Sequence, residues 1–367
     1  MIKKLFGGMQ WTEQPTIGLD IGSYAVKMVE LSGSPARVPG SQPHNQTLRR
    51  IGMARVPAGV ISEGSIKEYN ILLDIISSLL SNLQPKNKKV TSSISGYSVI
   101  VKKITLGYKT EKEIEDNLAL EAENYIPFDI QDVFMDFHML KEGATDKTTD
   151  IFLAAAKKDI VNLYANLIQD LGFTPSIIDV DTFALNNSLE MAVADKPDAL
   201  NAIGIIDMGA TKSNLVISVA GEPVFMRDMA IGGNQLTEAI AESTGMSFDD
   251  AERTKLIGTT DSSLAGEISL VCMDVCQVWS EEIRKALEFY QANTTSSQGL
   301  KKLFLTGGTA MLDGLIQKIS EAVGIATMLF DPFEGFGLDK GINPRYVQQI
   351  GPQFAVALGL ALRTVQK

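Results

Sequence analysis

The sequence predicts an α/β protein in which one strand arrangement occurs twice. Its 367 residues are too many for one compact core, and with 45% hydrophobic residues the chain is too apolar to be disordered. Roughly one domain per 150 residues gives two or three units. An apolar strand, an Asp-x-Gly turn and a returning strand occur at Asp20, and again 187 positions later at Asp207. Such a repetition indicates an internal repeat.

The composition excludes several classes of protein. The chain has 33 basic and 44 acidic residues, a net charge of −11, which disfavours general binding to nucleic acid. No apolar run reaches the roughly 18 residues of a membrane span, and the first 11 residues lack the pattern of a secretory signal. Cys272 and Cys276 are the only cysteines, and His44 and His138 lie far apart. These residues give neither a disulfide framework nor a zinc motif, so we expect a cytosolic protein.

The first part of the chain predicts a hairpin, a third strand and a helix. Strands at 16–20 and 26–31 flank the first Asp-x-Gly turn. Residues 33–47 are rich in Gly, Pro, Ser and Asn, which predicts a loop before a strand at 48–56. Apolar residues three and four apart over 66–83 predict a helix with one buried face.

The middle of the chain predicts a small α+β unit inserted into the larger fold. Residues from about 100 to 175 follow the order strand, helix, strand, strand, helix. The elements are one or two strands within 90–106, an acidic helix at 111–125 before Pro127, strands at 133–140 and 150–156, and a helix at 159–171. We expect this insert to recognise a partner.

The last part repeats the first hairpin and adds helices. Its elements are a strand at 176–180, a helix at 181–194, a strand at 203–207, a turn at 208–213, strands at 214–219 and 222–229, helices within 235–257 and 263–291, a strand at 302–305 and a final helix at 354–365.

The two turns contain the residue types of a phosphate site. Glycine lets backbone N–H groups approach an anion closely, and an aspartate at a strand end can hold the water shell of Mg²⁺. A pair of glycines after a strand, Gly307 and Gly308, admits a flat base and ribose. One Asp-x-Gly turn by itself is better explained as a tight hairpin, which uses the same residues.

The order of these features resembles the superfamily of actin, the heat-shock chaperones and the sugar kinases. Its phosphate-1 motif is matched by Gly18–Ser23, its phosphate-2 motif by Ile206–Thr211 and its adenosine motif by Leu305–Thr309. The resemblance spans about residues 14–365. It implies a two-lobed actin-like ATPase fold built on ribonuclease H-like repeats.

Within this superfamily the chain is similar to the PilM family of type IV pilus assembly, which is related to the cell-division protein FtsA. Four segments carry the likeness: GLDIGSYAVKMVEL (18–31), LEAENYIPFDIQDVFMDF (120–137), IIDVDTFALNNSLE (177–190) and LFLTGGTAMLDGL (303–315). The second resembles subdomain 1C, which replaces actin's 1B. The implied subdomains are 1A (14–99, 176–199 and 353–367), 1C (100–175), 2A (200–233 and 300–352) and 2B (234–299).

The resemblance implies that ATP and Mg²⁺ are held between two lobes. Asp20 and Asp207 would orient the metal through water, and with Asp181 they are the implied catalytic residues. The implied nucleotide-binding residues are Gly22, Ser23, Tyr24, Lys27, Gly209, Ala210, Thr211, Lys212, Arg284, Gly307, Gly308 and Thr309.

Three of these positions leave alternatives open. Lys212 either reaches the site or points outward. Arg284 either contacts the adenine, as its helix does in the chaperones, or belongs to a solvated helix face. Asp181 stands where PilM relatives usually carry a glutamate that positions the attacking water. Because aspartate is one methylene shorter, the resemblance implies weak or no ATPase activity.

The implied function is that of a scaffold in the machine of type IV pili and twitching motility. PilM-like proteins bind the cytoplasmic N-terminus of PilN, an inner-membrane protein, in a groove that involves 1A and 1C. We therefore expect a cytoplasmic protein held at the inner membrane through PilN. We do not expect the apolar spacing within residues 1–9 to be needed for this. Further expected partners are pilus motor ATPases and the platform protein, in a ring or small oligomer. A turnover ATPase, a small-molecule kinase and an FtsA-like filament former are the alternatives.

Overall fold

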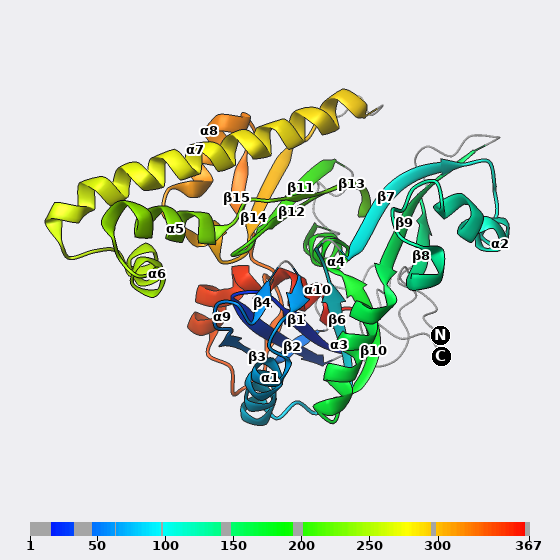
Figure 1. The fold of residues 1–367 in the computed structure, drawn as a ribbon, viewed down its shortest axis with the longest axis horizontal. Coiled ribbons are helices and arrows are strands. Elements are labelled where there is room, and N and C mark those ends of the chain that lie inside the picture. The colour runs from blue at the N-terminus through cyan, green and yellow to red at the C-terminus, as the bar shows by residue number, and fades with distance from the viewer. Residues whose placement is uncertain are drawn as a thin grey trace. The chain divides into compact units, whose positions relative to one another are not determined.

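The computed structural model describes residues 16–32, 46–62, 64–96, 98–140, 148–193, 201–294 and 299–363. The interpretations of residues 1–9 and of most of 33–47 therefore lie outside the described residues. The chain divides into two compact units (Figure 1). The first unit comprises Met1–Ser188, Phe333–Val347 and Val356–Lys367, and the second comprises Leu189–Pro332 and Gln348–Ala355.

The first unit is built on a six-stranded sheet with the order β10-β6-β1-β2-β3-β16. β1, β2 and β3 are antiparallel neighbours, whereas β6 runs parallel to β1 and β10 parallel to β6. The strands are β1 (Ile17–Ile21), β2 (Ala25–Ser32), β3 (Thr47–Arg55), β6 (Lys89–Ile94), β10 (Thr174–Val180) and β16 (Gly337–Leu338). A separate small hairpin pairs β4 (Ile61–Ser62) with β5 (Ser65–Ile66).

The two faces of this sheet pack against different helices. Alternate residues of a strand point to opposite faces, so Ile17 and Leu19 share a core cluster with residues of two helices. These are α1 (Tyr69–Leu83) and α3 (Lys158–Asp170). Gly18 faces the other way, toward α10 (Ala355–Ala361), and a Cβ there would lie 2.0 Å from the carbonyl oxygen of Ala357. Glycine at this position is therefore what lets α10 lie directly on β1.

The predicted insert has a sheet and a core of its own. Its three strands follow the order β7-β9-β8 and are antiparallel. They are β7 (Val99–Leu106), β8 (Val133–Met139) and β9 (Thr149–Lys157). Their cluster includes Ile114 and Leu118 from α2 (Glu111–Ala122), which begins with a capping box at Thr110. The short helix η1 (Ile130–Asp132) precedes β8. α3 differs from the other elements of residues 100–175, because its buried residues join the core of the six-stranded sheet.

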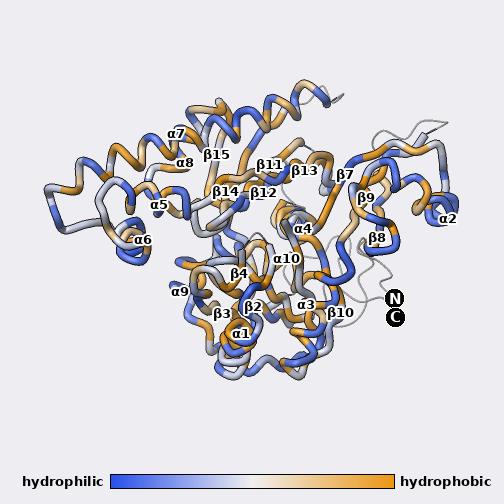
Figure 2. Tube along the Cα trace, in the orientation of Figure 1, coloured by the Kyte–Doolittle hydropathy of each residue, from blue (hydrophilic) through white to orange (hydrophobic). Residues whose placement is uncertain are grey.

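The second unit is built on a five-stranded sheet with the order β13-β12-β11-β14-β15. Its strands are β11 (Ala202–Met208), β12 (Ser213–Val219), β13 (Glu222–Met229), β14 (Lys302–Thr306) and β15 (Thr327–Leu329). Its helices are α5 (Gly233–Thr244), α6 (Phe248–Ile257), α7 (Ser262–Asn293), η3 (Thr309–Met311) and α8 (Leu315–Val323). Hydrophobic and hydrophilic residues alternate along α7 (Figure 2), and its buried face carries Trp279 into the core.

The predicted repeat is confirmed. β3-β2-β1-β6-β10 of the first sheet and β13-β12-β11-β14-β15 of the second share one order, with an antiparallel trio followed by two parallel strands. β15, β16 and α9 (Pro344–Ile350) were not predicted. The final predicted helix begins as η4 (Gly351–Phe354) and continues as α10. α4 (Asp181–Val193) and α10 each contain a boundary between the units. Within the described ranges, no helix is long and apolar enough to span a membrane.

Candidate functional site

The first Asp-x-Gly turn connects β1 to β2. The N–H of Gly22 donates to the carbonyl of Ala25 over 3.2 Å, which closes the turn. A Cβ at Gly22 would lie 3.1 Å from that same carbonyl oxygen and 3.5 Å from Lys27 Nζ. A side chain at this position would therefore crowd the turn, and glycine keeps its backbone accessible.

Asp20 and Lys27 lie directly opposite each other on β1 and β2. Lys27 Nζ donates to Asp20 Oδ2 over 2.8 Å, and the two side chains are only 18% and 11% exposed. The sequence assigned the carboxylate to a metal and the ammonium to phosphate. The structure brings the two groups together, so each neutralises much of the other's charge.

Ser23 and Tyr24 form the tip of this turn, where both are half-buried. The carbonyl of Tyr24 accepts from the N–H of Val56 over 2.8 Å. The guanidinium of Arg55 lies over the Tyr24 ring, 5.2 Å from its centre. The end of β3 therefore fixes the position of the turn.

The second turn, between β11 and β12, reproduces the first. Asp207 lies opposite Asn214, and the N–H of Gly209 donates to the carbonyl of Lys212 over 3.0 Å. Each of these residues stands 187 positions after its counterpart in the first turn. One position differs in chemistry, because Asn214 occupies the place of Lys27.

The second turn packs against the start of α5. The carbonyl of Gly209 accepts from the N–H of Gly233 over 3.0 Å and from Thr309 Oγ1 over 2.8 Å. The carbonyl of Ala210 accepts from the N–H of Asn234 over 2.8 Å. Carbonyl oxygens would repel a phosphate, and these two are directed toward α5 and η3 instead. Thr309 therefore helps to position the turn, and its predicted role toward the nucleotide stays a prediction.

Gly307 and Gly308 have different surroundings. Gly307 has φ +88°, and a Cβ there would lie 2.4 Å from Asp207 Oδ1. Its own backbone and the neighbouring carboxylate therefore both demand glycine. At Gly308 a Cβ would meet only Gln353 Oε1, at 3.6 Å. The packing of the second unit leaves room for a side chain at position 308.

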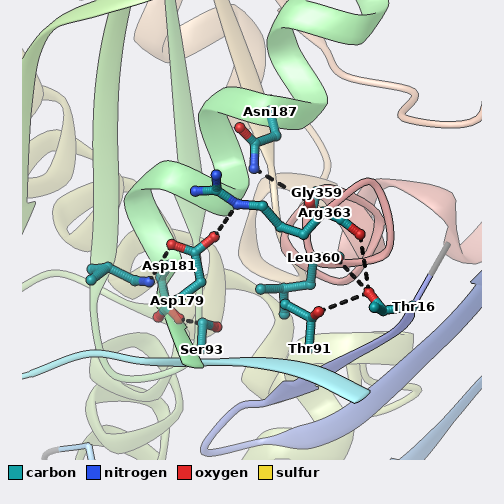
Figure 3. A network of polar contacts seen from close by, with 10 residues as sticks. Thr16, Thr91, Ser93, Asp179, Asp181, Asn187, Gly359, Leu360 and Arg363 are labelled. Carbon is teal, nitrogen blue, oxygen red and sulfur yellow. Dashed lines mark hydrogen bonds and ion pairs between the residues drawn. The ribbon is translucent and has the colours of Figure 1, made fainter. Parts of the chain in front are cut away.

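Asp181 lies at the start of α4 in a polar network of the first unit (Figure 3). Its Oδ1 accepts from Ser93 Oγ over 2.6 Å. Burial raises the pKa of Tyr164, and the charges of Asp181 and Asp20 raise this pKa further. Two of the predicted catalytic carboxylates, Asp20 and Asp181, are therefore within electrostatic reach of one phenol.

The same network contains the buried carboxylate of Asp179. Arg363 Nε donates to Asp179 Oδ2 over 2.6 Å (Figure 3). Burial raises the pKa of Asp179 above its usual value, and the charge and hydrogen bond of Arg363 oppose that effect. Thr16 Oγ1 donates to the carbonyls of Leu360 and Arg363 over 3.4 and 3.3 Å, which fixes the residues at the end of α10 beside β1.

Arg284 lies on an exposed part of α7 and pairs with Glu288 one turn further along, at 2.5 Å. Its role toward a nucleotide stays a prediction. Lys212 lies in the second turn, directly before β12, and is half-buried. Among the described residues, no group of three or more His, Cys, Asp and Glu side chains is arranged to hold a metal ion by itself.

The structure also shows a buried charge pair that the sequence analysis missed. Lys255 Nζ lies 2.6 Å from Glu252 Oε2 on α6, and the side chains are only 8% and 3% exposed. Lys255 Nζ also donates to Thr237 Oγ1 over 2.8 Å and to the carbonyl of Gly233 over 3.1 Å. The N–H of Gly233 is the group that donates to the carbonyl of Gly209 in the second turn. The sequence shows a Glu and a Lys three residues apart on a predicted helix, but such pairs usually lie on an exposed helix face, so the pattern does not indicate a buried pair.

Comparison with known proteins finds one family model and one solved structure that match nearly the whole chain. The model of the family described as type IV pilus assembly protein PilM matches residues 18–365. A chain of the solved PilM-PilN type IV pilus biogenesis complex has a TM-score of 0.83 and 30% sequence identity. That match covers 97% of this chain and 100% of the other.

More distant structures share the fold. The ethanolamine utilization protein EutJ from Carboxydothermus hydrogenoformans has a TM-score of 0.55 and 14% identity, and the match covers 96% of this chain and 90% of EutJ. MreB5 of Spiroplasma citri bound to ADP has a TM-score of 0.50 and 13% identity, with 94% of each chain covered. Cell division protein FtsA of Borreliella burgdorferi is 24% identical over 191 residues, which are 47% of this chain and 45% of FtsA. The chain thus spans less than half of that relative. The predicted actin-like α/β fold is confirmed.

Proposed function

Because the chain belongs to the PilM family of type IV pilus assembly proteins, we propose that it is an ATP-binding, actin-like scaffold of the pilus machine. In this proposal it binds the cytoplasmic N-terminal segment of PilN, and bound nucleotide favours the form of the chain that PilN recognises. Since PilN is an inner-membrane protein, this contact places the chain at the cytoplasmic face of that membrane. The match along the whole chain to a protein of the PilM-PilN complex carries the proposal.

The residues of the two turns fit a nucleotide. Gly22 and Gly209 keep the turns free of side chains, and their geometry is the same in both repeats. Gly308 supports the fit independently, because the packing of the second unit does not explain a glycine there. A ribose and base lying against the backbone would explain it, since they would fill the space that a side chain takes.

The main residues of the two turns have separate roles in this proposal. The turn backbones at Gly22, Ser23, Gly209 and Ala210 bind phosphates, and Lys27 offsets phosphate charge while Asp20 orients it. Asp207 holds the water shell of the Mg²⁺ that accompanies ATP. Gly307 lets β14 end beside the Asp207 carboxylate.

Glu252 and Lys255 extend the proposed site. Their side chains are buried at the start of α5, which supports the second turn. We propose that this pair, in addition to Arg284, contributes to binding the nucleoside. A buried ammonium paired with a carboxylate offers fixed donor and acceptor groups, whereas the exposed Arg284 pairs within its own helix.

Asp181 bears on hydrolysis. When bound, ATP supplies the cleavable phosphoanhydride, and a carboxylate must hold a water in line with it. Asp181 is fixed by Ser93 Oγ, and it is one methylene shorter than a glutamate. We therefore propose that the chain binds ATP with weak or no turnover.

The inserted three-stranded sheet offers a means of binding an extended peptide. β7 and β8 are its two outer strands among the described residues. An extended segment can pair with such an edge through backbone hydrogen bonds, while its side chains enter neighbouring pockets. We propose that the N-terminal segment of PilN binds the insert in this way.

The nucleotide part of the proposal is tested by calorimetric titration with Mg·ATP. Gly308→Val places a branched side chain where the base and ribose are proposed to lie, so we expect at least tenfold weaker binding. Gly341→Val is the matched control, because a Cβ at Gly341 meets nothing within 4 Å. Equal ATP affinity in the two variants would remove Gly308 from the site, and no ATP binding by the wild type would end the nucleotide proposal.

The partner part is tested with an immobilised PilN N-terminal peptide and the full chain, with and without Mg·ATP. We expect tighter binding with nucleotide, and we expect Gly308→Val to lose only that increase. Binding that ignores nucleotide would contradict the coupling. No binding in either condition would contradict PilN as the partner.

A further inference from the structure

Arg363, which follows α10, connects the two sides of the first sheet's parallel strands (Figure 3). Its carbonyl accepts from Thr16 Oγ1, directly before β1, and its guanidinium reaches Asp179 on β10. Thr16 Oγ1 also shares a hydrogen bond of 2.7 Å with Thr91 on β6, the strand between these two. Because both its backbone and its side chain are bound, Arg363 holds its guanidinium in a fixed place near the end of β10.

Ser93 on β6 has a carboxylate on either side. It stands directly opposite Asp179 in the register of β6 and β10, and its hydroxyl donates to Asp181 Oδ1 over 2.6 Å. Opposite residues of neighbouring strands lie about 5 Å apart. Ser93 and Asp179 are only 4% and 0% exposed. A hydroxyl has one proton to donate, so Ser93 serves Asp181 fully only while Asp179 has donors of its own.

Arg363 is the side-chain donor of Asp179. Its Nε donates to Asp179 Oδ2 over 2.6 Å, and Asp179 Oδ1 accepts from the N–H of Val180 over 2.8 Å. The charge of Asp181 raises the pKa of Asp179, which shows that the two carboxylates interact. A buried carboxylate that loses a charged donor is costly. Without Arg363, Asp179 would therefore compete with Asp181 for the hydroxyl of Ser93.

We infer that Arg363 is a positioning residue for Asp181. By pairing with Asp179 it leaves the Ser93 hydroxyl to Asp181, and so it fixes that carboxylate in place. The inference rests on the proposed function for the nucleotide, in which Asp181 holds a water in line with the terminal phosphate of ATP. It links the segment after α10 to the nucleotide site through two hydrogen bonds, without contact between Arg363 and the nucleotide.

The test titrates the full chain by calorimetry with Mg·ATP and, separately, with Mg·ADP. Arg363→Met should weaken Mg·ATP binding by about threefold or more, the worth of one hydrogen bond. Mg·ADP binding should not change, because ADP lacks the phosphate that Asp181 faces. Asp181→Ala should show the same selective loss. A general loss of structure would instead weaken both nucleotides.

Three further chains separate positioning from other effects. Arg345→Met removes an exposed arginine of the same unit and should leave both affinities unchanged. Asp179→Asn combined with Arg363→Met should regain Mg·ATP affinity, because a neutral amide competes less for the Ser93 hydroxyl. Arg363→Met should cause no further loss in a chain that already carries Asp181→Ala. Equal weakening of both nucleotides by Arg363→Met, or a further loss of Mg·ATP binding in the Asp181→Ala chain, would overturn the inference.

Ser93→Ala tests the same link with the pair of Arg363 and Asp179 left in place. It should weaken Mg·ATP binding selectively, as Arg363→Met does, so the inference does not depend on the folding of one variant. Unchanged Mg·ATP affinity in Ser93→Ala would contradict it.

Urea unfolding of the nucleotide-free chain distinguishes failure of this inference from failure of the proposed function. The effects of Arg363→Met and Asp181→Ala on the unfolding equilibrium constant should be non-additive by about threefold or more, whereas those of Arg345→Met and Asp181→Ala should add. Non-additivity in a chain that binds no ATP would uphold the link and end the nucleotide proposal. Additive effects of Arg363→Met and Asp181→Ala in a chain that binds ATP would overturn the link and leave the proposed function standing.

Discussion

Gly359 on α10 lies so close to Ala184 on α4 that a Cβ at position 359 would stand 1.7 Å from the Ala184 carbonyl oxygen. Both helices contain a boundary between the two units, and both residues belong to the first unit. Asn187 Nδ2 on α4 donates to the carbonyl of Gly359 over 3.4 Å, which adds a polar contact at the same place. Only glycine fits this backbone-to-backbone contact.

Gly359→Ala should therefore destabilise the first unit. Since neither backbone can move away without disturbing the sheet below, we expect a loss of about 3 kcal/mol in the free energy of unfolding. Gly266→Ala on α7 is the control, because a Cβ there meets nothing within 4 Å, and alanine favours a helix by about 1 kcal/mol. Urea unfolding of both variants measures these changes. Equal changes in the free energy of unfolding for Gly359→Ala and Gly266→Ala would contradict the prediction.

The ion pair between Asp20 and Lys27 should be energetically coupled. Both side chains are largely buried, so removing one takes from the other a charged partner at 2.8 Å. A double-mutant cycle with Asp20→Asn and Lys27→Met should give a coupling energy of about 1–3 kcal/mol. The same cycle for the exposed pair Arg284 and Glu288 should give only about 0.3–0.5 kcal/mol. A coupling no larger for the first pair than for the second would contradict the burial argument.

Arg363→Met should make stability strongly dependent on pH. Burial raises the pKa of Asp179, and Arg363 lowers it again. Without Arg363 the folded-state pKa rises further above the unfolded value, so the folded chain holds its proton more tightly. Stability of the variant should therefore fall as pH rises from about 4 toward 7, more steeply than in the wild type. Chemical unfolding at several pH values measures this.

The matched control is the double variant that carries both Arg363→Met and Asp179→Asn. It has no buried carboxyl at position 179, so the added pH dependence should disappear. Its persistence in the double variant would show that another group causes it.

Tyr69→Phe should remove a hydrogen bond that the wild type loses only at strongly alkaline pH. The hydroxyl of Tyr69 donates to Asp170 Oδ2 over 2.6 Å and joins the start of α1 to the end of α3. Burial and this carboxylate raise the pKa of Tyr69 to about 12. The raised pKa means that the contribution is present in full below the unfolded-state value of about 10 and is lost as pH rises to about 12.

We therefore expect Tyr69→Phe to cost about 1 kcal/mol at pH 8, and the difference from the wild type to shrink between pH 10 and 11. Tyr346→Phe, at an exposed position, is the control and should have little effect at either pH. A difference that grows with pH would contradict the assigned direction.

Much of the fold was predictable because it rests on local patterns. The hairpin strands, the buried face of α1 and the breaks at Gly245 and Gly258 follow from periodicity and glycine placement. β16 was missed because two residues are too few to show a period, and it exists only by pairing with β3. α3 has an amphipathic pattern that predicts a helix, but the pattern does not say which sheet its buried face covers.

The candidate site was predictable to the level of its turns. Asp-x-Gly at Asp20 and Asp207 marks both turns, since glycine is required where the backbone is crowded. The pair of Glu252 and Lys255 was missed because the burial of a charge cannot be read from a helix with few apolar residues. Its burial comes from contacts with Thr237 and Gly233 on α5.

The sequence by itself determined the duplicated strand–turn–strand unit, the order of the elements and the kind of chemistry at each turn, because these depend on residues that are neighbours along the chain. Only the tertiary structure decided which groups meet: Lys27 with Asp20, Gly307 with Asp207, Gly359 with Ala184 and Arg363 with Asp179. The last two pairs join residues more than 170 positions apart, and no local pattern encodes such a contact. It was likewise the strand register that placed Asn214 between two carboxylates, where the first repeat has a lysine.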